Sequence, residues 1–436
     1  MYRKHSLTVQ YLITVLLPIV ESYTTLLPGR PFATVWNAPT SQCWGKYGVD
    51  LDLDPFDIVA NQNQTFSGSE MVIFYKNQLG MYPYYDQDSP VYGGLPQNVS
   101  LKDHLTTAYE DLVTTIPSED FKGVVVVDWE DWRPIWDRNW DAKEVYKRHS
   151  EEMVRERHPE WPDKKVIEAA KEEFEDAAAN FMMSTLDLGR KFRPGGLWGF
   201  YGFPNCYNAG YKKEGLNYTG ECPADQMAKN DLLKWMWRSS QALYPDIYLE
   251  QMLKSTEYVG RYVKHRVEEA FRVSGEALED NLPVLPYARI VYTYSMDFLT
   301  QEDLIQTIGQ SAALGTAGVI LWGNVDYSHS KEACLAVKSY IDNILGMYVV
   351  NVTTSSALCS RALCTGNGRC VRKDFTSNSH LHLNPENFNI KKNQTGHGFL
   401  VSGKPSKTDI LYMADKFQCR CYPGWKGLDC SQQVVF

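Results

Sequence analysis

The sequence predicts an α/β fold, with a (β/α) barrel followed by a small disulfide-rich domain. From Pro31 to about Gly346, short apolar segments alternate with helical patterns, which is typical of α/β proteins. Val124–Val127 is a run of four valines, and such runs indicate strands that are buried on both faces in parallel sheets. Six of the ten cysteines follow residue 358, which indicates a different, cysteine-rich unit at the C-terminal end.

Eight segments are expected to be strands, because they are short, apolar and bounded by turn residues. They are Phe32–Asn37, Ile58–Ala60, Met71–Tyr75, Gly123–Asp128, Leu197–Tyr201, Ile247–Leu249, Val284–Tyr292 and Gly318–Trp322. Several of them end in a polar or aromatic residue, namely Asn37, Tyr75, Asp128, Tyr201 and Trp322. Barrel enzymes build their sites at the C-terminal ends of the strands, so we expect a substrate cleft there.

Two helices are predicted with clear boundaries. The first runs from about Lys164 to Phe192, where Ile167, Phe174 and Phe181 recur at helical spacing and predict a face packed on the barrel. No chemistry is assigned to this apolar face. The second helix, Leu304–Leu314, leads into the last barrel strand.

Two carboxylates follow the four-valine strand directly. In an extended segment, residues i and i+2 point the same way, so Asp128 and Glu130 should project from one side of the strand end. Paired acids among tryptophans suggest acid chemistry on a sugar. The alternative is that these acids cap the next helix or hold an ion.

Composition limits the partners of this chain. Its 436 residues, 44% of them hydrophobic, suffice for a large core and more than one domain. The net charge of −9 argues against nucleic acid as a partner, because a basic surface would be needed. A negative total charge does not exclude an anionic substrate, since the local field of a cleft decides its binding.

Residues 1–22 are predicted to be a secretory signal peptide. Three basic residues at positions 3–5 precede Tyr11–Val20, an apolar stretch too short to span a bilayer. Cleavage is expected near Ser22, no later segment is expected to span a membrane, and the tail after Cys430 is too short for a lipid-anchor signal. The mature protein should be soluble, and either secreted or lysosomal.

The cysteines and the glycosylation motifs agree with export. An even number of cysteines, ten, favours disulfides in an exported chain. Five Asn-x-Ser/Thr motifs predict N-glycosylation; they begin at Asn63, Asn98, Asn217, Asn351 and Asn393.

The C-terminal cysteines resemble an epidermal-growth-factor-like (EGF-like) module. Cys419–Cys430 has the C-x-C-x8-C spacing with an aromatic residue between two glycines, and Cys364–Cys370 resembles the first half of such a module. The departure is a long insertion at about residues 371–418. The expected division is therefore a catalytic barrel over 23–350 and an EGF-like domain over 351–436. A zinc site is the competing interpretation, but histidines at ligand spacing are absent.

The resemblance to an EGF-like module implies a disulfide pattern. It would pair Cys359 with Cys370, Cys364 with Cys419 and Cys421 with Cys430. The spacing alone leaves the other fourteen pairings of six cysteines open.

Several longer motifs make the whole chain resemble the hyaluronidases of glycoside hydrolase family 56. The matching motifs are Ile73-Phe74-Tyr75, Pro83-Tyr84-Tyr85, Val127-Asp128-Trp129-Glu130-Asp131-Trp132-Arg133-Pro134, Arg138-Asn139-Trp140, Trp198-Gly199-Phe200-Tyr201, Pro204-Asn205-Cys206-Tyr207-Asn208, Ala242-Leu243-Tyr244-Pro245, Ile247-Tyr248, His265-Arg266 and Gly318-Val319-Ile320-Leu321-Trp322-Gly323. The resemblance implies a distorted, incomplete (β/α) barrel. It also implies hydrolysis of the β-1,4 bond between N-acetylglucosamine and glucuronate in hyaluronan.

The family mechanism gives the two carboxylates separate roles. Glu130 matches the proton donor, and burial together with the Asp128 charge is expected to favour its protonated form. Two acids on one strand end are poorly placed to attack opposite sides of a bond. The family instead uses the substrate's acetamido oxygen as nucleophile, and Asp128 matches the residue that orients this group. Glu130 then acts as base on water, which gives net retention.

Further positions match family site residues. Tyr201 and Tyr248 match tyrosines that bind the acetamido group, Trp322 matches a wall of its pocket, and Tyr75 and Arg266 match substrate-binding positions. Each aromatic residue taken singly is more often core packing. Arg266 could instead form a salt bridge within its helix.

The remaining four cysteines match two disulfides of the family. Cys43 and Cys334 match a link between the start and the end of the barrel, and Cys206 and Cys222 match one beside Tyr201. No catalytic thiol is expected among them.

One residue departs from the family pattern. Asp246 stands where the family tends to have a small polar residue, and in the cleft it would repel a glucuronate. A chondroitin-preferring hydrolase and a catalytically silent glycan-binding or adhesion protein therefore stay open as alternatives. No metal or organic cofactor is implied, and a monomer is expected. The pH optimum is not set by the sequence.

Overall fold

The structure is a computed structural model that describes the chain except residues 1–26, 28, 60–63, 278–281, 395 and 435–436. The predicted signal peptide at 1–22 and the glycosylation motif at Asn63 lie outside the described residues.

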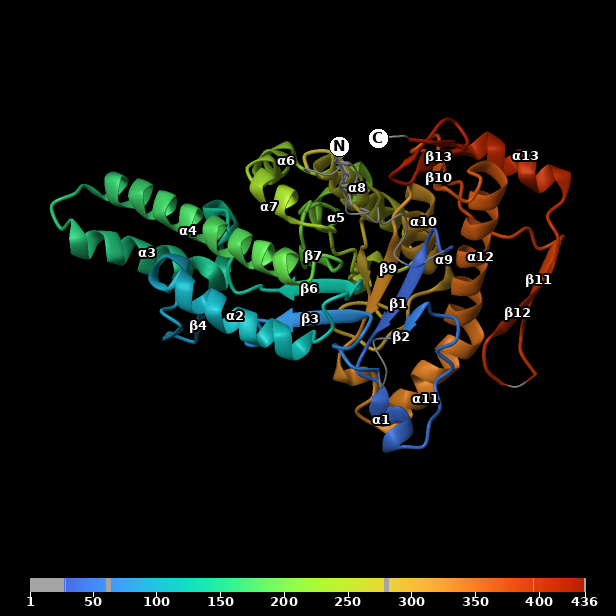
Figure 1. The fold of residues 1–436 in the computed structure, drawn as a ribbon, viewed down its shortest axis with the longest axis horizontal. Helices are drawn as coiled ribbons and strands as arrows, with labels where there is room; N and C mark the ends of the chain where they lie inside the picture. Colours follow the sequence, from blue (N-terminus) through green and yellow to red (C-terminus); the bar gives the residue numbers. More distant parts are fainter. Residues whose placement is uncertain (1–26, 28, 60–63, 278–281, 395, 435–436) are drawn as a thin grey trace, which may run out of the picture.

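Two parallel sheets form the centre of the protein (Figure 1). One has the order β3 (Met71–Tyr75), β6 (Val124–Asp128), β7 (Leu197–Phe200), and the other has the order β2 (Ile58–Val59), β1 (Ala33–Asn37), β9 (Gly318–Trp322), β8 (Tyr287–Ala288). Every residue of β1 and of β6 is buried except Asp128 at the end of β6. Burial on both faces agrees with the continuous apolar runs of these strands.

Single β-bridges connect the two sheets. Tyr244 pairs with Tyr201 after β7, Leu243 pairs with Val284, and Asp246 pairs with Tyr287 of β8. The order of parallel neighbours therefore runs from β3 through β6 and β7 to β8, β9, β1 and β2.

Two strand predictions were wrong in this linking region. No strand forms at Ile247–Leu249, because the bridges lie at residues 243, 244 and 246 instead. The expected strand Val284–Tyr292 shrinks to β8, with isolated bridges at Val284 and Val291. Pro245, Pro283 and Pro286 have no N–H group to donate, so a continuous ladder cannot form here.

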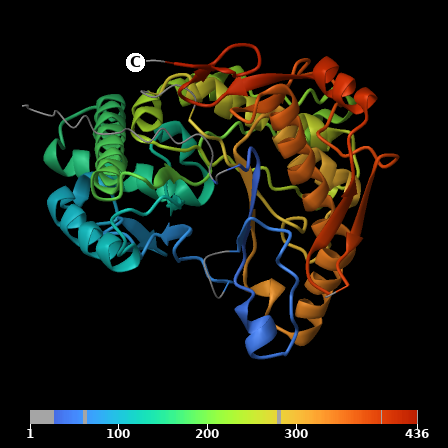
Figure 2. The same cartoon turned by 45° about the vertical axis from the view of Figure 1, so that its right-hand side comes forward.

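Helices cover the sheets on both sides. α2 (Leu101–Thr115), α3 (Glu144–Arg157) and α4 (Asp163–Phe192) pack together beside β3, β6 and β7, in cyan to green in Figure 2. α8 (Tyr258–Ser274), α11 (Lys331–Tyr340) and α12 (Gly346–Leu363) pack with the other sheet. The apolar face of α4 is buried through Phe174 and Phe181, but Ile167 is 42% exposed and does not belong to it.

The expected helix at Leu304–Leu314 is longer and irregular. It begins as α9 (Gln301–Leu304), continues through a π-helical turn at Ile305–Gly309 and ends as α10 (Gln310–Leu314). The Thr300 hydroxyl accepts a hydrogen bond from the Asp303 N–H and caps the start.

The other elements are short. The α-helices are α1 (Ser41–Gly45), α5 (Tyr211–Glu214), α6 (Ala224–Asp231) and α7 (Lys234–Ser239), and β4 (Tyr84–Asp86) pairs with β5 (Ser89–Val91). Single 3-10 turns lie at Pro96–Asn98, Trp136–Arg138, Asp141–Lys143, Gly215–Asn217, Gln251–Leu253 and Val325–Tyr327.

One helical stretch, Lys331–Leu363, is long and apolar enough by composition to cross a membrane. This differs from the expectation that no later segment has such length and apolarity, and residues 343–360 within the stretch carry no charged side chain. Half of its most apolar window is buried inside the protein, where Val337, Val349 and Val352 belong to the core. Cys334 and Cys359 also tie it covalently to other segments. Its surroundings are those of a core helix.

The C-terminal cysteine-rich unit is small and partly antiparallel. β10 (Gly368–Arg372) pairs with β13 (Phe417–Cys421), and β14 (Trp425–Lys426) pairs with β15 (Gln432–Gln433). The expected boundary at residue 350 falls inside α12, so the barrel and this unit share a helix.

The insertion forms a hairpin and a helix against the barrel. Its elements are β11 (Phe388–Lys392), β12 (Phe399–Gly403) and α13 (Lys407–Lys416). Lys392 binds the carboxylates of the buried Asp52 and of Asp342, and the Gly398 N–H also donates to Asp52. The insertion is therefore attached to the barrel by charged contacts.

All ten cysteines are paired in disulfides. The pairs are Cys43–Cys334, Cys206–Cys222, Cys359–Cys370, Cys364–Cys419 and Cys421–Cys430. These are the five pairs that the two resemblances imply.

The longest disulfide loop generates a stability prediction. Cys43 and Cys334 are 291 residues apart, so their link restricts the unfolded chain strongly. Replacing both with serine should lower the free energy of unfolding by roughly 5–6 kcal/mol on the chain-entropy model. Thermal unfolding of the double variant against the parent measures this. A Cys421→Ser/Cys430→Ser variant, which opens a loop of separation 9, should lose less. Equal losses would contradict the explanation by loop length.

Candidate active site

Parallel register brings the polar strand ends into one row. Tyr75 at the end of β3 is paired with Asp128 at the end of β6, and Asn37 at the end of β1 is paired with Trp322 at the end of β9. A cavity of about 140 Å³ opens at this row. We name it the acetamido cavity for the role proposed below, and it is lined by Ile73, Val126, Asp128, Glu130, Tyr201, Tyr248, Tyr287 and Trp322.

The two carboxylates differ in exposure. Asp128 is largely buried, and burial, followed by the charge of Glu130, raises its pKa from 3.8 to about 7. The Glu130 side chain is 52% exposed. The expected burial of Glu130 was therefore wrong, because the chain turns outward after β6 and leaves Asp128 at the base of the cavity. With a pKa of about 7, the Asp128 carboxyl is about half protonated near neutral pH.

Arg133 binds the exposed carboxylate. Its Nη2 lies 3.2 Å from Glu130 Oε1, and its Nη1 donates to the Trp129 carbonyl. Buried Asn139 fixes Arg133, since its amide bonds the Arg133 N–H and carbonyl, both at 2.8 Å. This arrangement holds the Glu130 carboxyl group in a fixed position beside the cavity.

The aromatic residues form the walls of the acetamido cavity. The rings of Tyr201 and Tyr248 are partly exposed, while burial of their hydroxyl groups raises the pKa of both well above the usual value. The two hydroxyls are hydrogen-bonded to each other. Because both stay protonated and one O–H is used between them, the other O–H can donate a hydrogen bond to a neutral ligand.

Trp322 and Tyr75 close the opposite side. The Trp322 ring stacks with Tyr248 at 6.3 Å and with Phe66 at 6.4 Å between centroids. Its Nε1 donates to the Tyr75 hydroxyl at 3.3 Å. Burial raises the pKa of Tyr75 to about 12. A planar amide or the apolar face of a sugar fits between such rings.

Arg266 lies behind the cavity and not among the residues that line it. It is 7% exposed, and its Nη1 donates to both the carboxylate and the carbonyl of Asp246 at 2.8 Å. Its Nε donates to Asn208 at 2.9 Å. The Asp246 charge is thereby offset inside the protein, so it is not free to repel an anionic substrate as the sequence had suggested.

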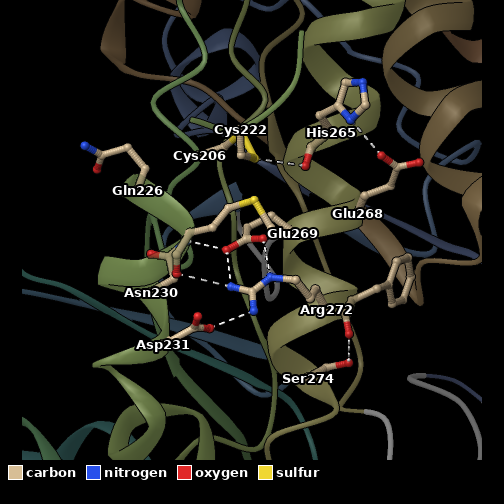
Figure 3. Close-up of polar contacts among 12 residues, drawn as sticks. Cys206, Cys222, Gln226, Asn230, Asp231, His265, Glu268, Glu269, Arg272 and Ser274 are labelled. Atoms are coloured by element: carbon tan, nitrogen blue, oxygen red, sulfur yellow. Dashed lines mark hydrogen bonds and ion pairs between the residues drawn. A yellow bond between two sulfur atoms is a disulfide. The ribbon is translucent and has the colours of Figure 1, made fainter. Parts of the chain in front are cut away.

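A second polar network supports the loop that follows Tyr201 (Figure 3). The Asn230 amide donates to Glu269 at 2.6 Å and to the Asn205 carbonyl at 3.1 Å. Arg272 binds Glu269 through two hydrogen bonds of 2.7 and 2.8 Å, and Asp231 at 2.7 Å. Glu269 is buried, so this pairing fixes α8 against α6 and the loop beside the Cys206–Cys222 disulfide.

Sequence patterns missed two groups at the site. Tyr287 lines the acetamido cavity, and among the described residues its buried hydroxyl has no hydrogen-bond partner. It lies within the predicted strand Val284–Tyr292, where nothing in the pattern separates it from core aromatics. Lys143 donates to the backbone carbonyls of Glu130 and Asp131, and its pKa is lowered to about 8 by burial and by Arg133.

Three side chains elsewhere have metal-ligand spacing. The ligand atoms of Asp52, Asp54 and His397 lie within 4.8 Å of one another. Asp52 already binds Lys392 and the Gly398 N–H, so internal pairing explains the group.

The described glycosylation motifs differ in exposure. Asn98 and Asn217 are exposed, whereas Asn351 and Asn393 are partly buried. The Asn351 side chain accepts a hydrogen bond from the Leu383 N–H at 2.8 Å. Glycosylation at these positions stays a prediction.

The pKa of Asp128 predicts a pH effect on stability. In the folded protein the pKa of Asp128 is about 7, above its usual value of 3.8. The contribution of Asp128 to the free energy of unfolding is therefore full below pH 3.8 and is lost as the pH rises through 7. Relative to the parent, an Asp128→Asn variant should therefore gain stability as the pH rises from about 4 to about 7 and keep that gain at higher pH, on the order of 4 kcal/mol at most. Thermal unfolding across this range measures the difference. Parallel pH curves for the two proteins would contradict it.

The Asp246–Arg266 pair generates a second prediction. Arg266→Met leaves a largely buried carboxylate unpaired and should destabilise the protein by about 3–5 kcal/mol. Adding Asp246→Ser should restore most of this loss, because no unpaired charge remains. Denaturant unfolding of the parent, the single variant and the double variant tests the pairing. A double variant no more stable than the single one would show that the two side chains are not coupled.

Comparison with known proteins agrees with this geometry. Residues 21–434 match the hyaluronidase family, glycoside hydrolase family 56. The chain is 47% identical to hyaluronidase-1 of Homo sapiens, covering 99% of both chains, and 47% identical to hyaluronidase-1 of Sus scrofa, covering 96% of this chain and 98% of that protein.

A solved structure shows the same fold. The crystal structure of bee venom hyaluronidase in complex with a hyaluronic acid tetramer matches with a TM-score of 0.67 and 34% identity, covering 74% of this chain and 99% of that one. These matches confirm the resemblance seen in the sequence motifs. The chain belongs to the hyaluronidase family of glycoside hydrolases.

Proposed function

We propose that this protein is an endo-β-N-acetylhexosaminidase that hydrolyses the β-1,4 bond between N-acetylglucosamine and glucuronate in hyaluronan. The supporting observation is the acetamido cavity, where buried Asp128 and exposed Glu130 lie among Tyr201, Tyr248 and Trp322. Its volume of about 140 Å³ suits one small group of a sugar and not a whole polymer, so the chain would lie across its mouth.

In the proposed mechanism, the N-acetyl group of the substrate is the nucleophile. Its carbonyl oxygen attacks the anomeric carbon while Glu130 donates a proton to the leaving oxygen. Asp128 lies at the base of the cavity and accepts the amide N–H, which stabilises the positive charge that develops on the ring. Tyr201 and Tyr248 orient the acetamido group as donors.

The second half of the proposed reaction returns Glu130 to its starting state. As a carboxylate paired with Arg133, it removes a proton from water, and the hydroxide oxygen opens the cyclic intermediate. Two displacements on the same carbon give net retention. Tyr75 and Trp322 bind the sugar ring. Arg266 acts through Asp246 and not by direct contact, which changes the role first expected for it.

Two further proposals concern architecture. Residues 23–350 form an incomplete (β/α) barrel, since the strand order from β3 to β2 is continuous and among the described residues no pairing joins β2 to β3. Residues 351–436 form an EGF-like module, supported by its three disulfides and the β10–β13 pairing. Its insertion, residues 371–418, holds the module on the barrel through Lys392.

The disulfides also bear on where the protein is found. Five disulfides favour an oxidising compartment, so we propose that the protein is secreted or lysosomal.

Glu130→Gln tests the proposed acid. The substitution keeps the shape but removes the transferable proton, so hyaluronan fragmentation should slow by about 10²–10⁴-fold. Gel analysis of hyaluronan length over time measures it, with Glu173→Gln on α4, an exposed partner of Arg157, as the matched control. Unchanged fragmentation in Glu130→Gln would reject its role. Parent protein that cleaves chondroitin faster than hyaluronan would indicate the chondroitin-preferring alternative. Binding without cleavage of either would indicate a silent glycan-binding protein.

A further inference from the structure

A second cavity adjoins the acetamido cavity. Its volume is about 620 Å³, and its lining includes Tyr85, Asp131, Lys143 and Tyr146. Glu130 lines both cavities, so they meet at the proposed acid. We name the larger one the leaving-group cavity.

The proposed function, on which this inference rests, indicates which sugar of the substrate occupies the leaving-group cavity. If N-acetylglucosamine places its acetamido group in the first cavity, the bond to be cut lies beside Glu130. The sugar on the other side of that bond is a glucuronate. The leaving-group cavity must then accept a carboxylate close to two acidic residues, Glu130 and Asp131, which requires a compensating positive charge.

Most cations around this cavity already have carboxylate partners. Lys76 binds Asp131 at 2.9 Å, and Arg133 binds Glu130 at 3.2 Å. Arg148 lies 3.6 Å from Asp88, and its side chain is 58% exposed, so solvent weakens its field.

Lys143 differs from these cations. It ends the 3-10 turn Asp141–Lys143, and its Nζ donates to the carbonyls of Glu130 and Asp131. Within the described part of the chain, Lys143 forms no ion pair with a carboxylate. An ammonium group has three donors, so one of them is available to a ligand. Because Lys143 is partly buried, its charge interacts more strongly with a bound carboxylate than the charge of an exposed lysine would.

We propose that Lys143 is a specificity-determining residue that binds the carboxylate of the departing glucuronate. Its two bonds to backbone carbonyls hold Lys143 beside the proton donor, in the lining of the cavity that takes the departing sugar.

The test compares two substrates that differ only in charge. Hyaluronan oligosaccharides and the same oligosaccharides with their carboxylates converted to methyl esters are hydrolysed by the parent and by Lys143→Met. A hydrogen bond to a charged group is expected to favour the acidic substrate by about 10- to 100-fold in kcat/KM. Lys143→Met should lose this factor on the acidic substrate and keep the parent rate on the ester.

A matched control separates specificity from general damage. Lys147→Met removes a nearby lysine on α3 that pairs with Glu144, and it should leave both substrates unaffected. Lys143→Arg, which keeps the charge, should retain part of the preference for the acidic substrate. An equal loss on both substrates in Lys143→Met would overturn the proposal and leave a structural role only. Unchanged rates on both would overturn it entirely.

Failure of the proposed function would give a different result. In that case the parent would hydrolyse neither oligosaccharide. The comparison then uses binding affinity for the same two ligands, measured by calorimetry on the parent and on Lys143→Met. A preference for the acidic ligand that is lost in Lys143→Met would support the carboxylate contact without catalysis, and an unchanged preference would reject it.

Discussion

Two carboxylates that leave one strand end side by side cannot both be ionised and buried without a large electrostatic cost. The structure resolves this by exposure, since Asp128 stays at the base of the cavity while Glu130 turns toward solvent and Arg133. The buried Asp128 therefore titrates near neutral pH, while the exposed Glu130 is paired with Arg133. The proposed chemistry depends on that division, because a buried group orients a neutral amide while an exposed group exchanges protons with sugar and water.

The surrounding protein keeps this arrangement rigid. Asn139 fixes Arg133, Arg266 offsets Asp246 behind Tyr248, and the network of Asn230 and Glu269 supports the loop after Tyr201. Each buried charge in these networks has an opposite charge or an amide partner, as buried polar groups require. Backbone carbonyls contribute too, since those of Glu130 and Asp131 hold Lys143. Catalytic geometry here is a property of several elements and not of one motif.

The part of the fold that the sequence predicts well is the part built from unbroken apolar runs. Met71–Tyr75 and Gly318–Trp322 form strands with the expected limits, since each run has a single burial pattern and no proline. The strands near Pro245, Pro283 and Pro286 fail because proline removes the donors that a ladder needs. Which of Asp128 and Glu130 is buried could not be predicted, because it depends on where the chain turns after β6.

Site residues also divide into those that sequence motifs predict and those that they do not. Asp128, Glu130, Tyr201, Tyr248 and Trp322 were predicted from motifs, and they line one cavity. Tyr287 was missed because its pattern does not separate it from core aromatics. Lys143 was missed because its position depends on how the loop after β6 folds back toward Glu130 and Asp131. The sequence left the role of Arg266 open between a substrate contact and an ion pair within its helix, and in the structure Arg266 pairs with Asp246, which lies outside that helix.

The central claim is that the cavity makes the substrate's own acetamido oxygen the nucleophile. Hyaluronan oligosaccharides with acetyl, fluoroacetyl, difluoroacetyl and trifluoroacetyl groups on nitrogen would test it most directly, by comparison of their kcat values at one pH. Fluorine withdraws electrons from the carbonyl oxygen, so the account predicts a steep fall in kcat with each added fluorine. A kcat that is insensitive to fluorination would contradict it and would point to an enzymic nucleophile instead.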